Sequence, residues 1–313
     1  MKSAQFRSYG GPEVIEIDRD AALPPLGGGQ VLVECHAASI NPVDSFLRAG
    51  YMQKMMPLAF PVTVAGDFAG EVKQLGPGVA DINVGANVYG MAAVFSGGSG
   101  AAAEYVVASA GSIAQKPGKA SFYEAASLPL AGVSAVQALE SSIKLTPGQR
   151  VLIHGGAGGV GSIAIQYAKH IGCFVATTVR GSQKEFASKL GADLVVDFEV
   201  EQFEGVLRDY DAVLDTVGGE VYRRSFQILK KGGVVATMVQ NPSDQELMSK
   251  FGVRSVYVGA QANRASLSHL SELVDAGVIK AQIDREFPLE MTREAYAYFE
   301  TGHPKGKVVI RVK

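Results

Sequence analysis

Short apolar runs separated by glycine and proline dominate the first part of the chain, up to about residue 120. The runs have the length and composition typical of strands, and they cover residues 31–35, 62–65, 70–75 and 105–108. This segment is therefore predicted to be a β-rich domain.

From about residue 123 the pattern changes to amphipathic helices alternating with apolar strands. Buried parallel strands are expected at residues 194–197, 211–215, 233–237 and 253–258. An amphipathic segment at 267–278, a helix near 294–299 and a strand at 307–311 then return the chain to the first domain. The expected domains are residues 1–122, a doubly wound parallel sheet over 123–261, and the return over 262–313. Ligands of open parallel sheets bind beyond the carboxyl ends of the strands, so the active site is expected in a cleft there.

A glycine-rich turn follows the apolar strand that ends at His154. It reads Gly156-x-Gly158-x-x-Gly161, and an apolar helical stripe and a second strand at 174–179 follow it. In such a turn Gly156 permits the tight bend, Gly158 admits a pyrophosphate, and Gly161 allows close helix packing. A merely structural glycine turn is the alternative, but the flanking strands and helix favour a Rossmann dinucleotide site. The predicted contacts are Gly156, Ala157, Gly158, Gly159, Val160 and Gly161.

The end of the second strand predicts which dinucleotide binds. An NAD site usually carries an Asp or Glu there, whereas this chain has Thr178, and no acid precedes Glu185. Arg180, Ser182 and Lys184 offer the donors that a 2′-phosphate needs. A solvated loop would also carry such residues, but it does not explain the missing acid. NADPH is therefore the predicted cofactor.

Composition excludes several classes of function. The chain has 313 residues, 47% of them hydrophobic, which is enough for about two domains with sizeable cores. A net charge of -2 gives no electrostatic case for nucleic acid. No signal-peptide core or long uncharged apolar span is visible, so cytoplasmic residence is expected. The two cysteines, Cys35 and Cys173, and the five histidines form no metal-ligand spacing, and His154 is expected to be a hydrogen-bonded structural residue.

Several further motifs together resemble one family. They are Asn41-Pro42-Val43-Asp44, Arg48-Ala49-Gly50-Tyr51, Gly66-Asp67-Phe68-Ala69-Gly70, Gly85-Ala86-Asn87-Val88-Tyr89-Gly90, Leu190-Gly191-Ala192, Asp215-Thr216-Val217-Gly218-Gly219 and Gly306-Lys307-Val308-Val309. With the glycine turn, they make nearly the whole chain resemble the zinc-independent quinone oxidoreductase branch of the medium-chain dehydrogenase/reductase superfamily. The resemblance implies a Rossmann domain inserted in a β-rich GroES-like domain, and a homodimer. Ala86 departs from the family's common Gly-Asp-x-Val.

The resemblance also implies that zinc is absent. Zinc-dependent relatives carry a metal-binding Cys at the position of Asn41 and a Gly-His-Glu motif at Gly66-Asp67-Phe68. Without a Lewis acid an isolated ketone is a poor hydride acceptor. A quinone or an α,β-unsaturated carbonyl delocalises the developing charge, so a few hydrogen-bond donors suffice. These acceptors are the predicted substrates.

Two polar residues are candidates for catalysis. Asn41 comes from the family motif, and Tyr51 carries a phenol that could orient a carbonyl oxygen or deliver a proton. Asn41 could instead be a turn residue before Pro42, and Tyr51 could be the wall of an apolar pocket beside several methionines. Asp44 and Arg48 are interpreted as structural, with Asp44 able to border the pocket.

Further cofactor contacts are expected on the Rossmann side. Ser134 matches a family position near the nicotinamide, and Val217 and Gly218 follow the fourth strand. Val239, Gln240 and Asn241 follow the fifth strand, and Val258 closes the last. The apolar members of this set could serve only packing.

The sequence thus predicts an NADPH-dependent, zinc-independent reductase of quinones or activated enones. Its enzymatic rival is a 2-enoyl-thioester reductase in which Tyr51 donates a proton to the α-carbon, and a long acyl channel would identify it. A rival of another class is an NADPH-binding sensor or a structural protein, as some relatives are lens crystallins. The physiological acceptor and one- versus two-electron reduction stay open.

Overall fold

The computed structural model describes residues 1–239 and 244–313, which form two compact units. The first unit comprises Met1–Ala131, Gln261–Gly277 and Ala281–Lys313. The second comprises Gly132–Ala260 and Val278–Lys280, so it is an insertion in the first. No helix in the described part of the chain combines the length and apolarity needed to cross a bilayer.

The first unit is built on two β-sheets. A three-stranded sheet has the order β2-β1-β4, with β1 Ser3–Phe6, β2 Ile15–Asp18 and β4 Val62–Thr63. A seven-stranded sheet has the order β15-β16-β3-β5-β6-β8, with β7 paired to β3. Its strands are β3 Gln30–Ser39, β5 Asp67–Leu75, β6 Asn87–Met91, β7 Tyr105–Ser109, β8 Ile113–Gln115, β15 Ile283–Pro288 and β16 Lys307–Arg311. The helices of this unit are α1 Pro42–Arg48, α2 Phe122–Ala126, α9 Arg264–Asp275 and α10 Thr292–Phe299, and α3 Pro129–Gln137 runs on into the second unit.

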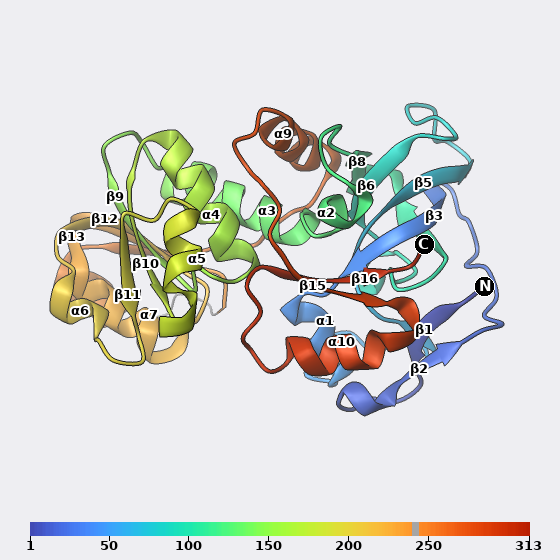
Figure 1. The fold of residues 1–313 in the computed structure, drawn as a ribbon, viewed down its shortest axis with the longest axis horizontal. Coiled ribbons are helices and arrows are strands. Elements are labelled where there is room, and N and C mark those ends of the chain that lie inside the picture. The colour runs from blue at the N-terminus through green and yellow to red at the C-terminus, as the bar shows by residue number, and fades with distance from the viewer. Residues whose placement is uncertain (240–243) are drawn as a thin grey trace. The chain divides into compact units, whose positions relative to one another are not determined.

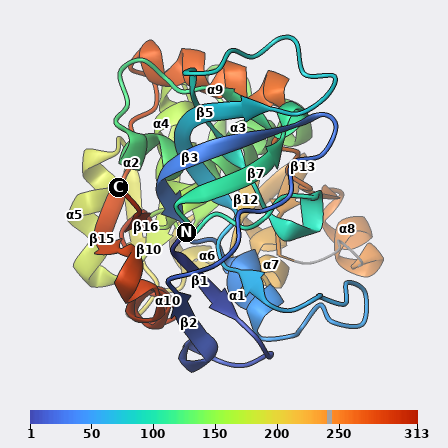
Figure 2. The same ribbon diagram turned by 90° about the vertical axis from the view of Figure 1, so that its right-hand side faces the viewer.

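The core of the first unit follows from strand alternation. In β3, Val31, Val33 and Cys35 are buried while the residues between them are half-buried, as a strand with one face on a core requires. Figure 2 shows β3 between β5 and β7, with which it pairs antiparallel. Both cysteines of the chain are buried and free.

The second unit contains one parallel sheet of six strands in the order β11-β10-β9-β12-β13-β14. The strands are β9 Arg150–His154, β10 Phe174–Val179, β11 Leu194–Asp197, β12 Tyr210–Asp215, β13 Leu229–Thr237 and β14 Arg254–Tyr257. The helices are α4 Gly159–Ile171, α5 Lys184–Lys189, α6 Phe203–Val206, α7 Gly219–Ser225 and α8 Gln245–Phe251. The predicted α/β fold with a Rossmann sheet and a β-rich domain is confirmed.

Helices cover both faces of this sheet. Alternate strand residues, among them Leu152, Val213 and Val235, pack with Phe203 of α6 and Tyr222 of α7 in one core. Helices α4 and α5 lie on the other side (Figure 1). This is the layering that a parallel sheet needs, because both of its faces are apolar.

Short turns of other helix types complete the chain. They are the 3-10 turns Pro12–Val14, Val94–Ser96, Ala110–Ser112, Gly181–Gln183, Phe226–Ile228 and Leu289–Met291, and the π-helical segment Ala138–Ile143.

Several elements differ in their bounds from the sequence-based predictions, β3, β5 and β13 by being longer, and three further differences have a visible reason or change the burial. The helix expected at 267–278 is α9, which begins earlier because the Asn263 side chain caps it and ends before Gly277, whose φ is +77°. The strand expected at 62–65 ends at Thr63, and Ala65 adopts a left-handed φ of 65°. The strand expected to be buried at 253–258 is β14, a partly exposed edge strand that pairs with β13.

Candidate active site

The glycine turn lies between β9 and α4. Gly155, directly after the strand, has a φ of +69°, so the tight bend that the sequence assigned to Gly156 is made one residue earlier. Gly156 is a glycine for another reason. A Cβ there would lie 1.9 Å from Thr177 Oγ1 on the neighbouring strand, so only a bare backbone fits. The role predicted for Gly156 therefore needs correction.

The start of α4 is open to an anion. Gly158 is its N-cap, and no side chain caps the helix. A Cβ on Gly158 would meet one atom, Gly155 O at 3.4 Å, whereas a Cβ on Gly161 would overlap the same oxygen at 2.2 Å. Gly161 thus permits the close packing of α4 on the turn, and the first amides of α4, at Gly159 and Val160, are available to phosphate oxygens. The turn fits a dinucleotide pyrophosphate, while the Ala157 side chain packs in a small core with Val179 and Ala187.

Thr178, near the end of β10, belongs to a buried neutral cluster. Its Oγ1 lies 2.9 Å from His154 Nδ1, and His154 Nε2 lies 3.0 Å from Ser225 Oγ. Ser225 donates its hydroxyl proton to Val221 O at 2.7 Å, so His154 is the donor to Ser225 and the acceptor from Thr178. Burial lowers the pKa of His154 to about 3, which keeps the ring neutral. The structural role expected of His154 is confirmed.

The polar residues after β10 lie on the surface. Arg180 precedes the turn Gly181–Gln183, and its guanidinium pairs with Glu199 at 2.9 Å and stacks over Phe198. Ser182 and Lys184 are exposed. Arg180 is therefore already engaged with a carboxylate, a partner that the sequence pattern did not indicate.

The loops after β12 and β13 are held by a buried carboxylate. Asp215 Oδ1 accepts hydrogen bonds from the amides of Val217 (3.0 Å) and Gly218 (2.8 Å), and Oδ2 accepts from Thr237 Oγ1 (2.8 Å). Gly218 has a φ of +79°, which explains the glycine. Thr216 Oγ1 donates to His154 O, so this loop packs beside the glycine turn.

The remaining predicted cofactor residues differ in exposure. Val217 and Val239 are about half exposed, whereas Ser134 on α3 and Val258 after β14 are buried. Gln240 and Asn241 lie outside the described residues. All the predicted cofactor residues that the structure describes belong to the second unit.

Asn41 in the first unit is the centre of a buried polar cluster. Its Nδ2 donates to Asp67 Oδ2 at 2.9 Å, and its Oδ1 accepts from Lys307 Nζ at 2.5 Å. Asp67 Oδ2 also accepts from the Leu130 amide, and Lys307 Nζ also donates to Ile40 O. The three side chains are 0–5% exposed. We call Asn41, Asp44, Asp67 and Lys307 the Asn41 cluster.

Asp44 closes the cluster from α1. Its carboxylate accepts from the Asn41 amide at 2.8 Å, which caps the helix. Burial raises the pKa of Asp44 to about 7 and that of Asp67 to about 6, although Lys307 opposes both changes. Burial likewise lowers the pKa of Lys307, and the two carboxylates oppose it. The cluster therefore holds several ionisable groups in little water.

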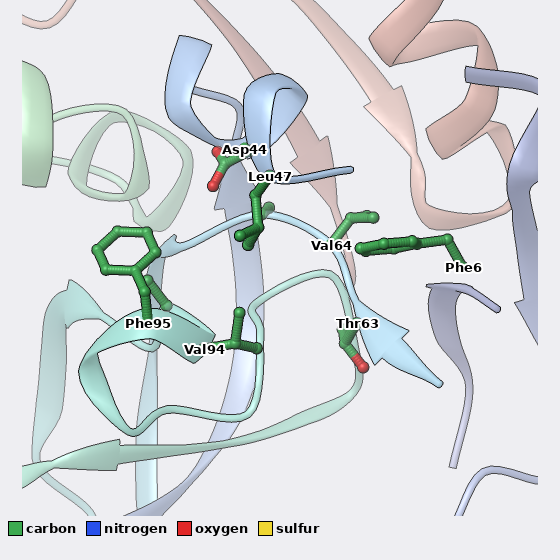
Figure 3. A pocket seen from close by; sticks show the side chains of 9 residues that line it. Phe6, Asp44, Leu47, Thr63, Val64, Val94 and Phe95 are labelled. Carbon is green, nitrogen blue, oxygen red and sulfur yellow. The ribbon is translucent and has the colours of Figure 1, made fainter. Parts of the chain in front are cut away.

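Asp44 also borders a small cavity, lined otherwise by apolar groups of α1 and of the segments around Thr63 and Val94. Figure 3 shows Asp44 and Leu47 of α1 near Phe95 and Val94 of the 3-10 turn. The cavity volume is about 10 Å³, roughly enough for one water molecule. It is too small for a quinone ring.

Tyr51 is not part of the Asn41 cluster. It lies beyond the C-terminal end of α1, which begins directly after Asn41 and spans about 10 Å. Its side chain is 79% exposed within the described residues and packs edge-on against Phe46 at 5.9 Å. Arg48, interpreted as structural, is buried and bonds to Gly10 O and Glu300.

Sequence reasoning missed three residues of these sites. Lys307 stood in the closing family motif and in the last predicted strand but was given no role, although a lysine that begins an apolar strand is a signal that could have marked it. Glu199 had no such signal. Asp215 stood in a family motif, but its loop-holding role needed the hydrogen bonds to be visible.

Comparisons with known proteins place these sites in a family. The alcohol dehydrogenase GroES-like domain matches residues 27–118, and the zinc-binding dehydrogenase family matches residues 190–310. The chain is 35% identical to a 2-methylene-furan-3-one reductase of Solanum lycopersicum, over 99% of this chain and 79% of that protein. It is 32% identical to an NADPH-dependent alkenal/one oxidoreductase, chloroplastic, of Arabidopsis thaliana, with the same coverage.

A solved structure agrees along the whole chain. The quinone oxidoreductase from Coxiella burnetii superposes with a TM-score of 0.93 at 36% identity, covering 100% of this chain and 99% of that one. The chain belongs to the medium-chain dehydrogenase/reductase superfamily, in its quinone oxidoreductase-like branch. The resemblance deduced from the motifs is confirmed.

The family name raises the question of zinc, and the residues present do not fit it. Where zinc-dependent relatives carry ligands, Asn41 and Asp67 bond to each other, and the Lys307 amino group donates to Asn41 Oδ1. A metal cation bound beside Asn41 would be repelled by the positive charge of Lys307. Across the described residues, no group of three or more His, Cys, Asp or Glu side chains is arranged to hold a metal ion.

Proposed function

We propose that this protein is an NADPH-dependent, zinc-independent reductase that transfers hydride to quinones or activated α,β-unsaturated carbonyls. The observation that carries the proposal is the glycine turn. It fits a pyrophosphate, and the neighbouring strand β10 has Thr178 near its end and Arg180 just after it, where an NAD site usually carries an acid. The names of the relatives, two enone-type reductases and a quinone oxidoreductase, support the substrate class.

The residues of the second unit bind and orient the cofactor in this proposal. NADPH supplies the hydride when it is bound. The amides of Gly159 and Val160 hold the pyrophosphate, and Gly158 lets it approach. Arg180, with Ser182 and Lys184, binds the 2′-phosphate, for which Arg180 exchanges its exposed pairing with Glu199. Ala157, Ser134, Val217, Gly218, Val239 and Val258 shape the rest of the site.

The Asn41 amide is the proposed donor to the substrate oxygen. Negative charge develops on that oxygen as hydride arrives at carbon, and a fixed donor in a site of little water stabilises it. Conjugation in a quinone or enone spreads the same charge, so no metal is required. The Asn41 cluster supplies the fixed donor.

Tyr51 has a smaller role in this proposal. Its exposed phenol can line the substrate site or donate the proton that completes the reduction, which for an enone as for a 2-enoyl thioester goes to the α-carbon; water is the proton source where Tyr51 only lines the site. A sensor or structural protein that binds NADPH without turnover is the rival from another class. Cytoplasmic residence and a homodimer remain predictions from the sequence and the resemblance.

One panel of assays tests the proposal. NADPH oxidation is followed against ortho-quinones, para-quinones, 2-alkenals and enoyl thioesters, with NADH as the matched cofactor and after exhaustive chelation. We expect turnover of quinones or 2-alkenals, a preference for NADPH, and no loss on chelation. Turnover of enoyl thioesters alone would favour the thioester reductase. Tight NADPH binding with no turnover of any acceptor would favour the sensor.

A further inference from the structure

The Asn41 carboxamide is held at both ends by side chains from other parts of the first unit. Lys307 on β16 donates to its oxygen at 2.5 Å, and Asp67 on β5 accepts from its nitrogen at 2.9 Å. Each of these partners is itself tied to main chain. Lys307 donates to Ile40 O at 2.5 Å, and Asp67 accepts from the Leu130 amide at 3.1 Å.

These contacts fix which way the amide points. A rotation by 180° would set the NH2 group against the amino group of Lys307 and the oxygen against the carboxylate of Asp67. Both contacts would then be repulsive. The protonated amino group of Lys307 carries no lone pair and can only donate, so the contact with Lys307 fixes the orientation while the lysine is charged.

Within the part of the chain that the structure describes, the same contacts leave one Nδ2 hydrogen of Asn41 without a partner. Nδ2 carries two hydrogens, and Asp67 takes one of them. Donation by Lys307 to the amide oxygen draws electron density from the nitrogen, which strengthens the remaining N–H as a donor.

Helix capping does not explain the arrangement. The Asp44 amide, which is the donor that a capping Asn41 side chain would serve, bonds to the main-chain oxygen of Asn41 at 3.0 Å. Burying a lysine with carboxylates is also a poor way to gain stability, since apolar side chains of similar size serve as well or better. Stabilisation of the fold therefore does not explain why these polar groups are buried together.

We propose that Lys307 and Asp67 are positioning residues that hold the Asn41 carboxamide in one orientation, with one Nδ2 hydrogen presented to the substrate oxygen. This inference rests on the proposed function and deepens it. Lys307 and Asp67 touch neither substrate nor cofactor in this scheme, and they act through Asn41.

A double-mutant cycle tests the proposal. Lys307→Met, Asn41→Ala and the double variant are compared for kcat, KM and NADPH affinity, with a 2-alkenal and a quinone as acceptors. Lys305→Met, which removes an exposed lysine two residues earlier, is the matched control. We expect Lys307→Met to lower kcat for the alkenal tenfold or more, with NADPH affinity within twofold. In the Asn41→Ala background the same change should lower kcat less than twofold.

Equal effects of Lys307→Met in the two backgrounds would overturn the proposal, because the lysine would then act without Asn41. If Lys307→Met does not fold, Lys307→Met combined with Asp67→Leu removes the lysine and one of the two carboxyl groups together, and the same comparison with and without Asn41→Ala applies.

A second readout separates this inference from the proposed function. The Asn41 side-chain amide signals in ¹⁵N-labelled protein are assigned by their loss in Asn41→Ala. We expect Lys307→Met to shift them and Lys305→Met to leave them unchanged. Unshifted signals in Lys307→Met overturn the positioning role even where the wild type reduces enones. Shifted signals in a protein that reduces no acceptor support the orientation and reject the proposed function.

Discussion

The molecule contains two clusters of buried polar side chains, and the two differ in how these side chains are compensated for the loss of water. In the second unit, Thr178, His154 and Ser225 form a neutral chain in which every ring nitrogen and hydroxyl has a partner. In the first unit, the Asn41 cluster collects two carboxyl groups and an amino group, and Asp67 Oδ1 has no hydrogen-bond partner among the described residues. A neutral satisfied cluster costs little, whereas buried ionisable groups cost stability unless they are paired.

The two clusters also respond to pH with opposite sign. The folded-state pKa of His154 lies below its ordinary value, so the unfolded chain binds a proton that the folded chain does not, and stability falls as pH falls. The folded-state pKa values of Asp44 and Asp67 lie above their ordinary values, so stability falls as pH rises through them. The contrast agrees with the structural role of His154 and with the role in chemistry that we propose for the Asn41 cluster.

The largest expected effect comes from breaking the charged cluster. Lys307→Met leaves the carboxyl groups of Asp44 and Asp67 buried without their cation, and we expect the free energy of unfolding to fall by about 3–5 kcal/mol at pH 8. The loss should be smaller at pH 5, where protons neutralise the carboxylates. Urea unfolding at both pH values measures it, and Lys305→Met should stay within about 0.5 kcal/mol of wild type. An equal loss at the two pH values would show that the ionised carboxylates of Asp44 and Asp67 are not the cause of the destabilisation.

The neutral cluster should make the stability of the protein fall in acid. Between about pH 6.5, the ordinary pKa of His, and the folded pKa of about 3, His154 should cost about 1.4 kcal/mol of stability for each unit that the pH falls. His154→Gln has no titrating ring and should show a flatter dependence over pH 6 to 4. Parallel curves for the two proteins would show that His154 does not titrate as its burial requires.

Neutralising one carboxyl should sharpen the contrast. Asp44→Asn keeps an oxygen that can accept from the Asn41 amide but cannot ionise. Since the pKa of Asp44 is raised to about 7, the variant should gain stability relative to wild type as the pH rises from 5 to 8, on the order of 1–3 kcal/mol. The charge of Asp67 also raises the pKa of this carboxyl and that of Lys307 lowers it, so Asp67→Asn provides the companion curve. If the difference in free energy of unfolding between Asp44→Asn and wild type were constant from pH 5 to 8, Asp44 would not be the group that titrates in this range.

The smallest expected effect comes from Thr178, which belongs to the neutral cluster and lies near the proposed cofactor site. Thr178→Val removes the hydroxyl that donates to His154 and should cost about 0.5–1.5 kcal/mol of stability. Thr178→Val should lower NADPH affinity less than Arg180→Ala does. Arg180→Ala removes the proposed charge-assisted contact with the 2′-phosphate, which is worth about 1.5–3 kcal/mol. Calorimetric titration of NADPH and NADH against both variants measures this. Equal losses of both cofactors in Arg180→Ala would argue against a 2′-phosphate contact.

Local pattern was enough to predict much of the second unit. The strands expected at 174–179 and 194–197 match β10 and β11 residue for residue, because apolar runs between glycine-rich turns leave little choice of element. The pattern failed at β14, since a hydrophobic run does not say whether a second strand will cover its outer edge. It also misplaced the tight bend, because adjacent glycines look alike until φ is known.

The sequence by itself determined the alternation of strands and helices, the glycine turn, the missing acid after β10, and the candidacy of Asn41. Only the tertiary structure decided what surrounds them. Lys307 reaches Asn41 across 266 positions of the chain, and Asp67 reaches it across 26. Hydrophobic periodicity is a local property and survives in the sequence. The pairing of buried polar groups depends on which strands become neighbours, and that depends on the fold of the whole unit.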